Sequence, residues 1–269
     1  MTYCIVKRRF ERMIVPVGGN VAMIGGTGFE QLPPDIFAER LEIDTRFGKA
    51  VVLSVSDNYV EPFKLYFLSR HGAEHGLAPH QINYLANIAA LVELDVKYVY
   101  ATNAVGSLKT DIPPGSLVLL DDFLDCTRHR PLSYFAEGEI WKHSDFTEPY
   151  SAILRESLIS AASEMGIRLF EKGTYLCCDG PRFETPAEIR LFGSWGADVV
   201  GMTGLPEAIF AKEAGLEYAA LCLVTNLGAG LSPNPISHQE VVSMMQERVG
   251  EMQELLLRAG GLLITDSQK

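Results

Sequence analysis

The sequence has a deficit of positive charge, since 23 Lys and Arg against 34 Asp and Glu give its 269 residues a formal net charge of -11. Broad nucleic-acid binding needs a basic face that displaces counterions, so this composition argues against it. A small anionic ligand remains compatible, because a local pocket can be positive on an acidic protein. Apolar runs long enough to span a membrane are also missing. We therefore expect neither a nucleic-acid nor a membrane partner.

Cysteine is scarce, with five residues of which Cys177 and Cys178 are adjacent. An odd count in this pattern argues against a disulfide framework and for a cytoplasmic protein. Zinc-type spacings such as CxxC and HExxH are absent. His71 and His75 lie four residues apart, but the glycines between and after them disfavour a helix that would aim both at a metal. We expect no metal and no organic cofactor.

Linker-like segments are missing too, and 47% of the residues are hydrophobic, so one large α/β domain is expected. Residues 1–20 carry basic side chains without a sustained apolar stretch or a small-residue cleavage site, so we do not expect a signal peptide. This extension is either a mispredicted start or a disordered segment. The domain is expected to span residues 21–265.

Strand and helix patterns alternate along the chain, as in α/β proteins. Strands are expected at residues 21–24, 51–55, 64–69, 98–102, 116–120, 173–177, 198–200 and 218–225, and helices at 81–94, 151–165, 186–195, 206–214 and 237–259. Residues 125–150 form a long polar, aromatic and histidine-bearing loop. Long irregular segments in compact domains are often functional.

Several apolar strands end in small polar clusters, namely GGTG, RHG, TNAVG, GMTG and VTN. Ligands of open α/β sheets bind beyond the carboxyl ends of the strands. Five such clusters predict a pocket for a small molecule.

Four of these clusters offer donors to an anion. Backbone N–H groups of GGTG approach an anion closely and Thr27 adds a hydroxyl, although the spacing matches neither a dinucleotide fingerprint nor a P-loop. Arg70 has a planar fork suited to phosphate, and His71 adds a donor. Asn103 and Thr203 add further donors. The simpler alternatives are a tight turn and a surface ion pair.

Other residues suit a flat heterocycle. Phe183 would stack on it, Glu184 would accept from a ring N–H, and the amide of Asn226 would donate to it. The alternatives are that Glu184 merely begins a helix, that Asn226 forms an Asx-turn and that Met202 is core packing.

Taken together, the segments IGGTGFE, LSRHGAEH, PHQINYLANIAAL, TNAVGSL, EGEIWKHSDFTEPY, GPRFET, SWGADVVGMTGLPEAIFAKEAG and VTN resemble the trimeric nucleoside phosphorylases, in the branch of 5'-methylthioadenosine phosphorylase. They cover residues 22–242 in family order. The resemblance implies a single domain with a central mixed β-sheet, partly barrel-like and flanked by helices. It also implies a homotrimer or a dimer of trimers.

The resemblance assigns roles residue by residue. It implies phosphate contacts from Thr27, Arg70, His71, Asn103, Ala104 and Thr203, with Asn103 replacing a common Thr. Met202 would lie under the ribose, Phe183 would line the base, and His143 would reach the pocket of a neighbouring subunit.

Four positions bear on the substrate. Adenine-specific relatives carry Asp where this chain has Asn226 and Gly228, and methylthioadenosine enzymes carry Ser where it has Glu184. An asparagine amide donates to a purine O6, and a glutamate accepts from N1–H. His238 stands where methylthio-specific enzymes are apolar, and it would bond the ribose 5'-hydroxyl.

The predicted function is phosphorolysis of 6-oxopurine nucleosides, inosine and guanosine, to free base and ribose 1-phosphate in purine salvage. Asn226, Glu184 and His71 are the expected catalytic residues, and phosphate is a cosubstrate. The nearest alternative is an S-methyl-5'-thioinosine phosphorylase. Less favoured are a methylthioadenosine phosphorylase and a non-catalytic nucleoside-binding protein on the same fold.

Overall fold

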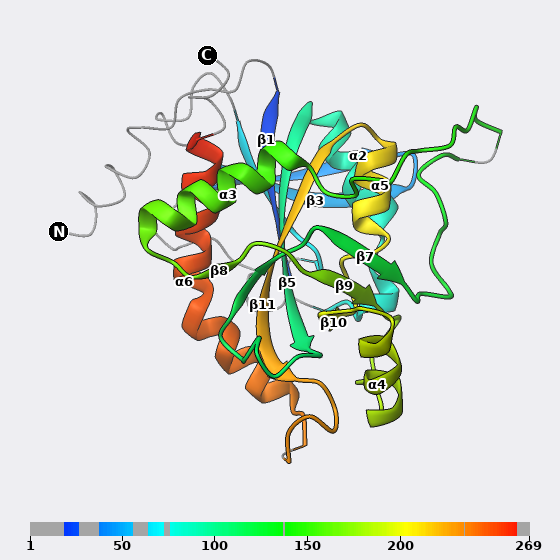
Figure 1. Ribbon diagram of the computed structural model, residues 1–269. Coiled ribbons are helices and arrows are strands. Elements are labelled where there is room, and N and C mark those ends of the chain that lie inside the picture. Colours follow the sequence, from blue (N-terminus) through cyan, green and yellow to red (C-terminus); the bar gives the residue numbers. More distant parts are fainter. Residues whose placement is uncertain are drawn as a thin grey trace.

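One long strand, β5 (Val96–Ser107), organises the sheet of the computed structural model (Figure 1). The structure describes residues 19–26, 38–55, 64–72, 76–136, 138–233 and 235–262. The other strands are β1 (Asn20–Gly25), β2 (Ala38–Thr45), β3 (Gly48–Val55), β4 (Leu65–Ser69), β6 (Leu117–Leu119), β7 (Asp122–Asp125), β8 (Leu169–Phe170), β9 (Thr174–Cys177), β10 (Val199–Gly201) and β11 (Glu217–Leu227). The helices are η1 (Pro79–Gln81), α2 (Tyr84–Glu93), α3 (Ala152–Met165), α4 (Pro186–Ser194), α5 (Glu207–Glu213) and α6 (His238–Leu262).

The strands pair in a mixed sheet that branches at β5. Its main path runs β2-β3-β4-β1-β5-β10-β9-β7, while β11 pairs with β5 and β6, and β6 pairs with β8. Parallel β11 follows one edge of β5 along residues 98–107. The opposite edge is shared, because β1 pairs with residues 96–101 and antiparallel β10 pairs only with residues 106 and 107. Residues 102–105 therefore have no strand partner on that edge within the described part of the chain.

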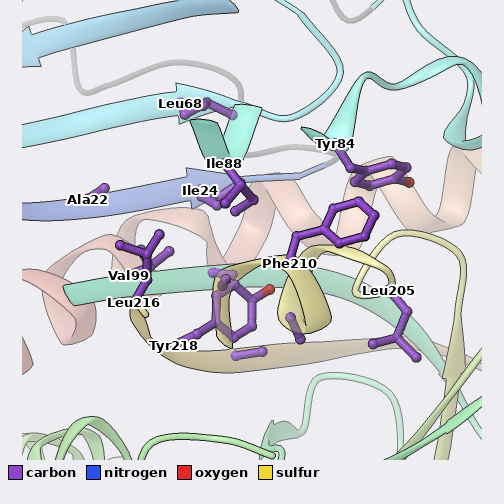
Figure 2. Packing of buried hydrophobic residues seen from close by; sticks show 14 of the residues in the cluster. Ala22, Ile24, Leu68, Tyr84, Ile88, Val99, Leu205, Phe210, Leu216 and Tyr218 are labelled. Carbon is purple, nitrogen blue, oxygen red and sulfur yellow. The ribbon is translucent and has the colours of Figure 1, made fainter. Parts of the chain in front are cut away.

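Helices cover both faces of the sheet. Successive residues of β1 alternate between two hydrophobic clusters, with Ala22 and Ile24 in one and Val21 and Met23 in the other. The first cluster includes side chains of α2 and α5, such as Ile88 and Phe210 (Figure 2), and the second includes side chains of α3 and α6. A strand buried on both faces needs a continuous apolar run, which is why these segments are recognisable in the sequence.

The expected α/β class, the mixed sheet and its flanking helices are confirmed. The expected end of the strand at residue 102 is wrong, because β5 continues through Asn103 and Gly106 to Ser107. Strands β2, β7 and β8 were not anticipated. Residues 1–18 of the expected extension lie outside the described residues. Asn20 already belongs to β1, and its side chain donates to the Leu94 carbonyl at the end of α2 at 2.8 Å.

Among the described residues, no helix is both long enough and apolar enough to cross a membrane.

Candidate active site

A cavity of about 390 Å³ lies where the open edge of β5 meets the ends of β1, β4, β10 and β11. Its volume falls within the range of small-molecule sites. Its lining includes three groups of residues. The His71 wall comprises Gly26, His71, Ala104 and Thr203; the Glu184 wall comprises Phe183, Glu184, Asn226 and Gly228; and the His238 wall comprises Ile236, His238 and Val241. The cavity thus gathers residues from all five clusters that the sequence analysis singled out.

The His71 wall is backed by a fully buried ion pair. Arg70 Nε and Nη2 each donate to a carboxylate oxygen of Glu207 at 2.7 Å, and Nη1 donates to the Thr102 carbonyl at 2.8 Å. Tyr218 donates a third hydrogen bond to Glu207. Burial acts to lower the pKa of Arg70, but the Glu207 carboxylate outweighs it and raises the pKa, so the guanidinium stays charged.

Arg70 itself does not line the cavity, and Gly26 separates the two. A Cβ atom at Gly26 would lie 2.7 Å from Arg70 Nη1 and 3.2 Å from the Thr102 carbonyl oxygen. Glu207 holds the guanidinium of Arg70 in place, so the guanidinium cannot move aside for a larger residue at position 26. The glycine brings a fixed positive charge directly behind the backbone of the cavity wall.

His71 faces the cavity with a defined tautomer. Its Nδ1 lies 2.8 Å from the Leu77 carbonyl oxygen. A carbonyl only accepts, so Nδ1 carries the proton of this hydrogen bond.

Two more predicted residues are joined by a hydrogen bond. Thr203 lines the cavity, and its hydroxyl donates to Asn103 Oδ1 at 3.1 Å. Asn103 is buried outside the lining, and within the described part of the chain no oxygen accepts from its amide nitrogen. Ala104 lines the cavity beside it, on the unpaired edge of β5.

The Glu184 wall combines an aromatic ring, a buried carboxyl and an amide. Burial raises the pKa of Glu184 above its usual value, and the nearby Glu188 carboxylate raises it further. Phe183 is partly exposed beside it, with 37% of its surface accessible. Helix α4 is capped by Thr185 and its first-turn acid is Glu188, so Glu184 precedes the cap and lines the cavity.

Asn226 follows a bulge in β11, where the pairing with β5 shifts register at Thr225. Bulges redirect side chains and are common beside active sites. The Asn226 oxygen accepts from the Thr225 hydroxyl at 2.9 Å, and its amide nitrogen donates to the Leu227 carbonyl at 2.9 Å. An amide nitrogen has two donors, so one is left for a ligand. Gly106 makes room for it, because a Cβ there would lie 3.1 Å from the Asn226 nitrogen.

The His238 wall stands at the start of α6. His238 is exposed and also lines the cavity. Ile236 and Val241 add apolar surface next to it. Met202 also lines the cavity and packs against Gly180, where a Cβ would lie 2.4 Å from the Met202 sulfur.

Of the predicted residues that the structure describes, Arg70, Asn103 and His143 do not line this cavity. Thr27 lies outside the described residues, as does His75. His143 is exposed in the loop after β7, where its ring contacts Trp141 at 5.0 Å between centroids. Among the described residues, no group of three or more His, Cys, Asp and Glu side chains is arranged to hold a metal ion.

Sequence reasoning missed residues that support the cavity from behind. Glu207 and Arg130 are the main ones, and Tyr175 accepts hydrogen bonds from the backbone N–H groups of Thr203 and Gly204. Glu207 pairs with a residue 137 positions away, a distance that no local pattern reveals. For Arg130 the only available signal was its place in the long loop already expected to be functional.

Comparisons with known proteins find relatives in sequence and in structure over most of the chain. The model of the phosphorylase superfamily matches residues 22–259. The 6-oxopurine nucleoside phosphorylase of Pyrococcus furiosus is 41% identical over 246 residues, covering 89% of this chain and 91% of that protein. A probable S-methyl-5'-thioinosine phosphorylase of Methanopyrus kandleri is 42% identical over 240 residues, covering 89% of this chain and 91% of that protein. The structure of methylthioadenosine phosphorylase from Schistosoma mansoni in complex with adenine gives a TM-score of 0.85 at 30% identity, covering 91% of each chain.

Proposed function

Because the chain belongs to the phosphorylase superfamily and is a purine nucleoside phosphorylase, a pentosyltransferase, we propose that it cleaves 6-oxopurine nucleosides with inorganic phosphate. The observation that carries this proposal is the Glu184 wall, where a carboxyl and an amide face one cavity. The products are the free base and ribose 1-phosphate. This activity belongs to purine salvage.

The Glu184 wall suits a 6-oxopurine. Ionised Glu184 accepts from N1–H, and the remaining Asn226 donor binds O6 or N7. A site built around such partners rejects bases that leave them unpaired, because buried unsatisfied polar groups are costly. The position two residues on is tight, since a Cβ at Gly228 would lie 3.0 Å from Ile189 Cδ1 and 3.2 Å from the Ser107 carbonyl oxygen. The second aspartate expected of adenine-specific enzymes would have to press these neighbours aside.

The His71 wall suits phosphate. His71, Thr203 and the backbone around Ala104 line this part of the cavity, and the Arg70 charge lies immediately behind Gly26. In this proposal His71 donates to phosphate from Nε2 as an imidazolium, and the Thr203 hydroxyl turns from Asn103 to the anion. Thr27 completes this set in our proposal. The buried Asn103 amide nitrogen is a further donor for the anion or for its neighbours.

The mechanism needs no covalent nucleophile. Phosphate held against C1' supplies proximity, and its negative charge stabilises the sugar as positive charge develops there. The C–N bond breaks as phosphate oxygen bonds to C1', and the electron pair leaves with the purine. Asn226 and Glu184 stabilise the departing base through hydrogen bonds. Neither a metal nor an organic cofactor takes part.

The His238 wall supports a second candidate substrate. The His238 imidazole suits a ribose 5'-hydroxyl, whereas Ile236 and Val241 suit an apolar 5' group such as methylthio. A relative named as a probable S-methyl-5'-thioinosine phosphorylase is 42% identical to this chain. We propose inosine and guanosine as the main substrates and methylthioinosine as the alternative.

Completion of the site by a second subunit is also proposed, in a homotrimer or a dimer of trimers. The loop that carries His143 exposes Ile140 by 95% and Trp141 by 66%. Exposed apolar side chains of this size indicate a surface that another molecule covers. His143 would then enter a neighbour's cavity. The free cysteines favour a cytoplasmic location.

A phosphorolysis panel tests the proposal. Purified protein is incubated with inosine, guanosine, adenosine, methylthioinosine or methylthioadenosine, with and without phosphate, and the released base is measured. We expect phosphate-dependent release of hypoxanthine and guanine and little release of adenine. Binding without release would identify a non-catalytic nucleoside-binding protein, and preferential release of adenine would refute the assignment of the Glu184 wall.

A further inference from the structure

Arg130 is a buried cation that the proposed chemistry does not use. It lies in the loop after β7, only 3% of its side chain is exposed, and it is not part of the cavity lining. Burying a guanidinium is costly unless its donors are satisfied, so its partners indicate why it is there.

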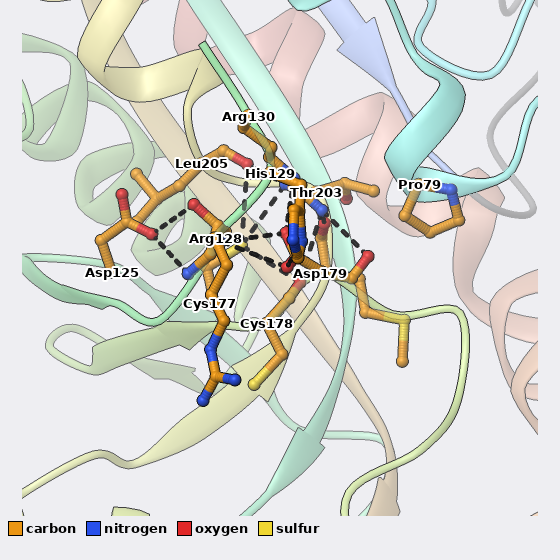
Figure 3. Close-up of polar contacts among 12 residues, drawn as sticks. Pro79, Asp125, Arg128, His129, Arg130, Cys177, Cys178, Asp179, Thr203 and Leu205 are labelled. Atoms are coloured by element: carbon orange, nitrogen blue, oxygen red, sulfur yellow. Dashed lines mark hydrogen bonds and ion pairs between the residues drawn. The ribbon is translucent and has the colours of Figure 1, made fainter. Parts of the chain in front are cut away.

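Those partners are almost all backbone carbonyls of two segments that form the cavity (Figure 3). In the first segment, Nη2 lies 2.6 Å from the Met202 carbonyl oxygen, and Nη1 donates to the Leu205 carbonyl. In the second segment, Nη2 reaches the carbonyl oxygens of Asp179 at 3.1 Å and Cys178 at 3.4 Å. One guanidinium therefore joins the turn after β10 to the turn after β9.

The two segments serve different parts of the proposed substrate. Residues 202–205 contribute Met202 and Thr203 to the cavity, and the turn after β9 leads directly to Phe183 and Glu184. The separation between the sugar–phosphate contacts and the base contacts depends on how these segments are held. Rate is sensitive to such spacing, since a misplacement of about 1 Å costs about 100-fold.

The surroundings of Arg130 fix its orientation as well as its charge. The guanidinium carbon lies 5.1 Å from the centre of the Tyr84 ring, which packs against the cation. The Asp179 carboxylate lies 3.6 Å from Nε and balances the charge. A planar fork can contact both segments at once, whereas a lysine ammonium is a single point.

We propose that Arg130 is a positioning residue that sets the distance between the base-binding and the sugar–phosphate-binding segments. The proposal rests on the proposed function, because it concerns how that reaction's two partners are aligned. Arg130 touches neither substrate. Its loss changes both binding segments together, which removal of a residue from a single wall does not.

The test compares Arg130→Ala and Arg130→Lys with Arg128→Ala as matched control. Arg128 is exposed, lies two residues away and uses its backbone N–H, not its guanidinium, to contact Asp179. For Arg130→Ala we expect kcat/KM for inosine to fall by about 100-fold, with KM for inosine and for phosphate both raised. Added guanidinium ion should restore at least about tenfold of the loss, whereas methylammonium should not. Arg128→Ala should match the wild type.

The outcomes separate the two proposals. An inactive wild type refutes the proposed function. An active wild type with full activity in Arg130→Ala, or a loss that guanidinium does not reverse in protein folded by circular dichroism, overturns the role of Arg130. If Arg130→Ala does not fold, Arg130→Lys decides, because unchanged KM values for both substrates in that variant also overturn it.

Discussion

The His71 wall and the His238 wall of the cavity differ in how firmly the fold holds them. Behind the His71 wall, Arg70 and Glu207 are 1% and 0% exposed and make a closed set of hydrogen bonds. His238 is exposed at the first turn of α6. The contrast teaches that the residues proposed to hold phosphate are supported by the core and change only at a cost in stability. The proposed contacts to the 5' group lie at the surface, where we expect substitution to alter specificity at little structural cost.

The largest effect is expected where the core supports the cavity. Glu207→Ala leaves the Arg70 charge buried and unpaired, which should lower the free energy of unfolding by about 3–5 kcal/mol. Urea denaturation measures the loss. Glu164→Ala is the control, because it breaks an exposed ion pair with Arg258 and should cost about 1 kcal/mol or less. Equal losses in the two variants would contradict the contrast drawn here.

The next effect concerns the departing base. Asn226→Ala should lower kcat/KM for inosine by about ten- to a thousand-fold, the scale of one lost contact to developing charge. The KM for phosphate should change little, because Thr203 and His71 are untouched. Steady-state kinetics with both substrates varied measures this. An unchanged rate with inosine would show that residue 226 has no leaving-group role.

A smaller and selective effect is expected at the His238 wall. His238→Val should lower kcat/KM for inosine by about 10- to 200-fold relative to kcat/KM for methylthioinosine, because it exchanges a polar contact for apolar surface. Stability should be nearly unchanged, as expected for an exposed position. The ratio of the two kcat/KM values is the measurement. Equal losses for both nucleosides would remove the 5'-hydroxyl assignment.

The smallest effect is a shift in pH dependence. Since burial raises the pKa of Glu184, its ionised form is lost as pH falls through a value above the usual one. The kcat/KM for inosine should therefore decline on the acid side at a higher pH in the wild type than an ordinary glutamate would give. Glu184→Gln should abolish that limb while lowering the rate at neutral pH.

The same raised pKa has a consequence for stability with the opposite sign. A carboxyl whose pKa is higher in the folded state favours folding below its unfolded pKa, and this contribution disappears as pH rises through the folded value. Glu184→Gln should thus increase the urea midpoint more at pH 7 than at pH 4. A greater gain at pH 4 would refute burial as the cause of the shift.

Sequence patterns predicted much of the fold because its strands are buried on both faces. The apolar runs of β1, β4 and β11 are recognisable in the sequence, and each ends in or is followed by a polar cluster that reaches the cavity. The end of β5 was placed too early, because Asn103 and Gly106 are typical of a turn. They remain in the strand because tertiary pairing with β10 and β11 overrides local preference.

The residues behind the cavity escaped prediction for a different reason. Arg130 bonds to partners 48 to 75 positions away, and Glu207 bonds to Arg70, 137 positions away. Nothing within a short window of sequence distinguishes such a residue from a solvated charge. Facing residues were recognisable by motif, whereas supporting residues became visible only with the chain folded.

Among the described residues, the stretch of β5 between its pairings with β1 and β10 has no strand partner on that edge, and this has an implication for how this protein family can change. The hollow beside it arises chiefly from which strands meet along one backbone. Substitutions can therefore exchange one ligand for another, or abolish turnover altogether, while the recess itself persists. Erasing it would require a different order of strand pairing, which point mutations do not supply.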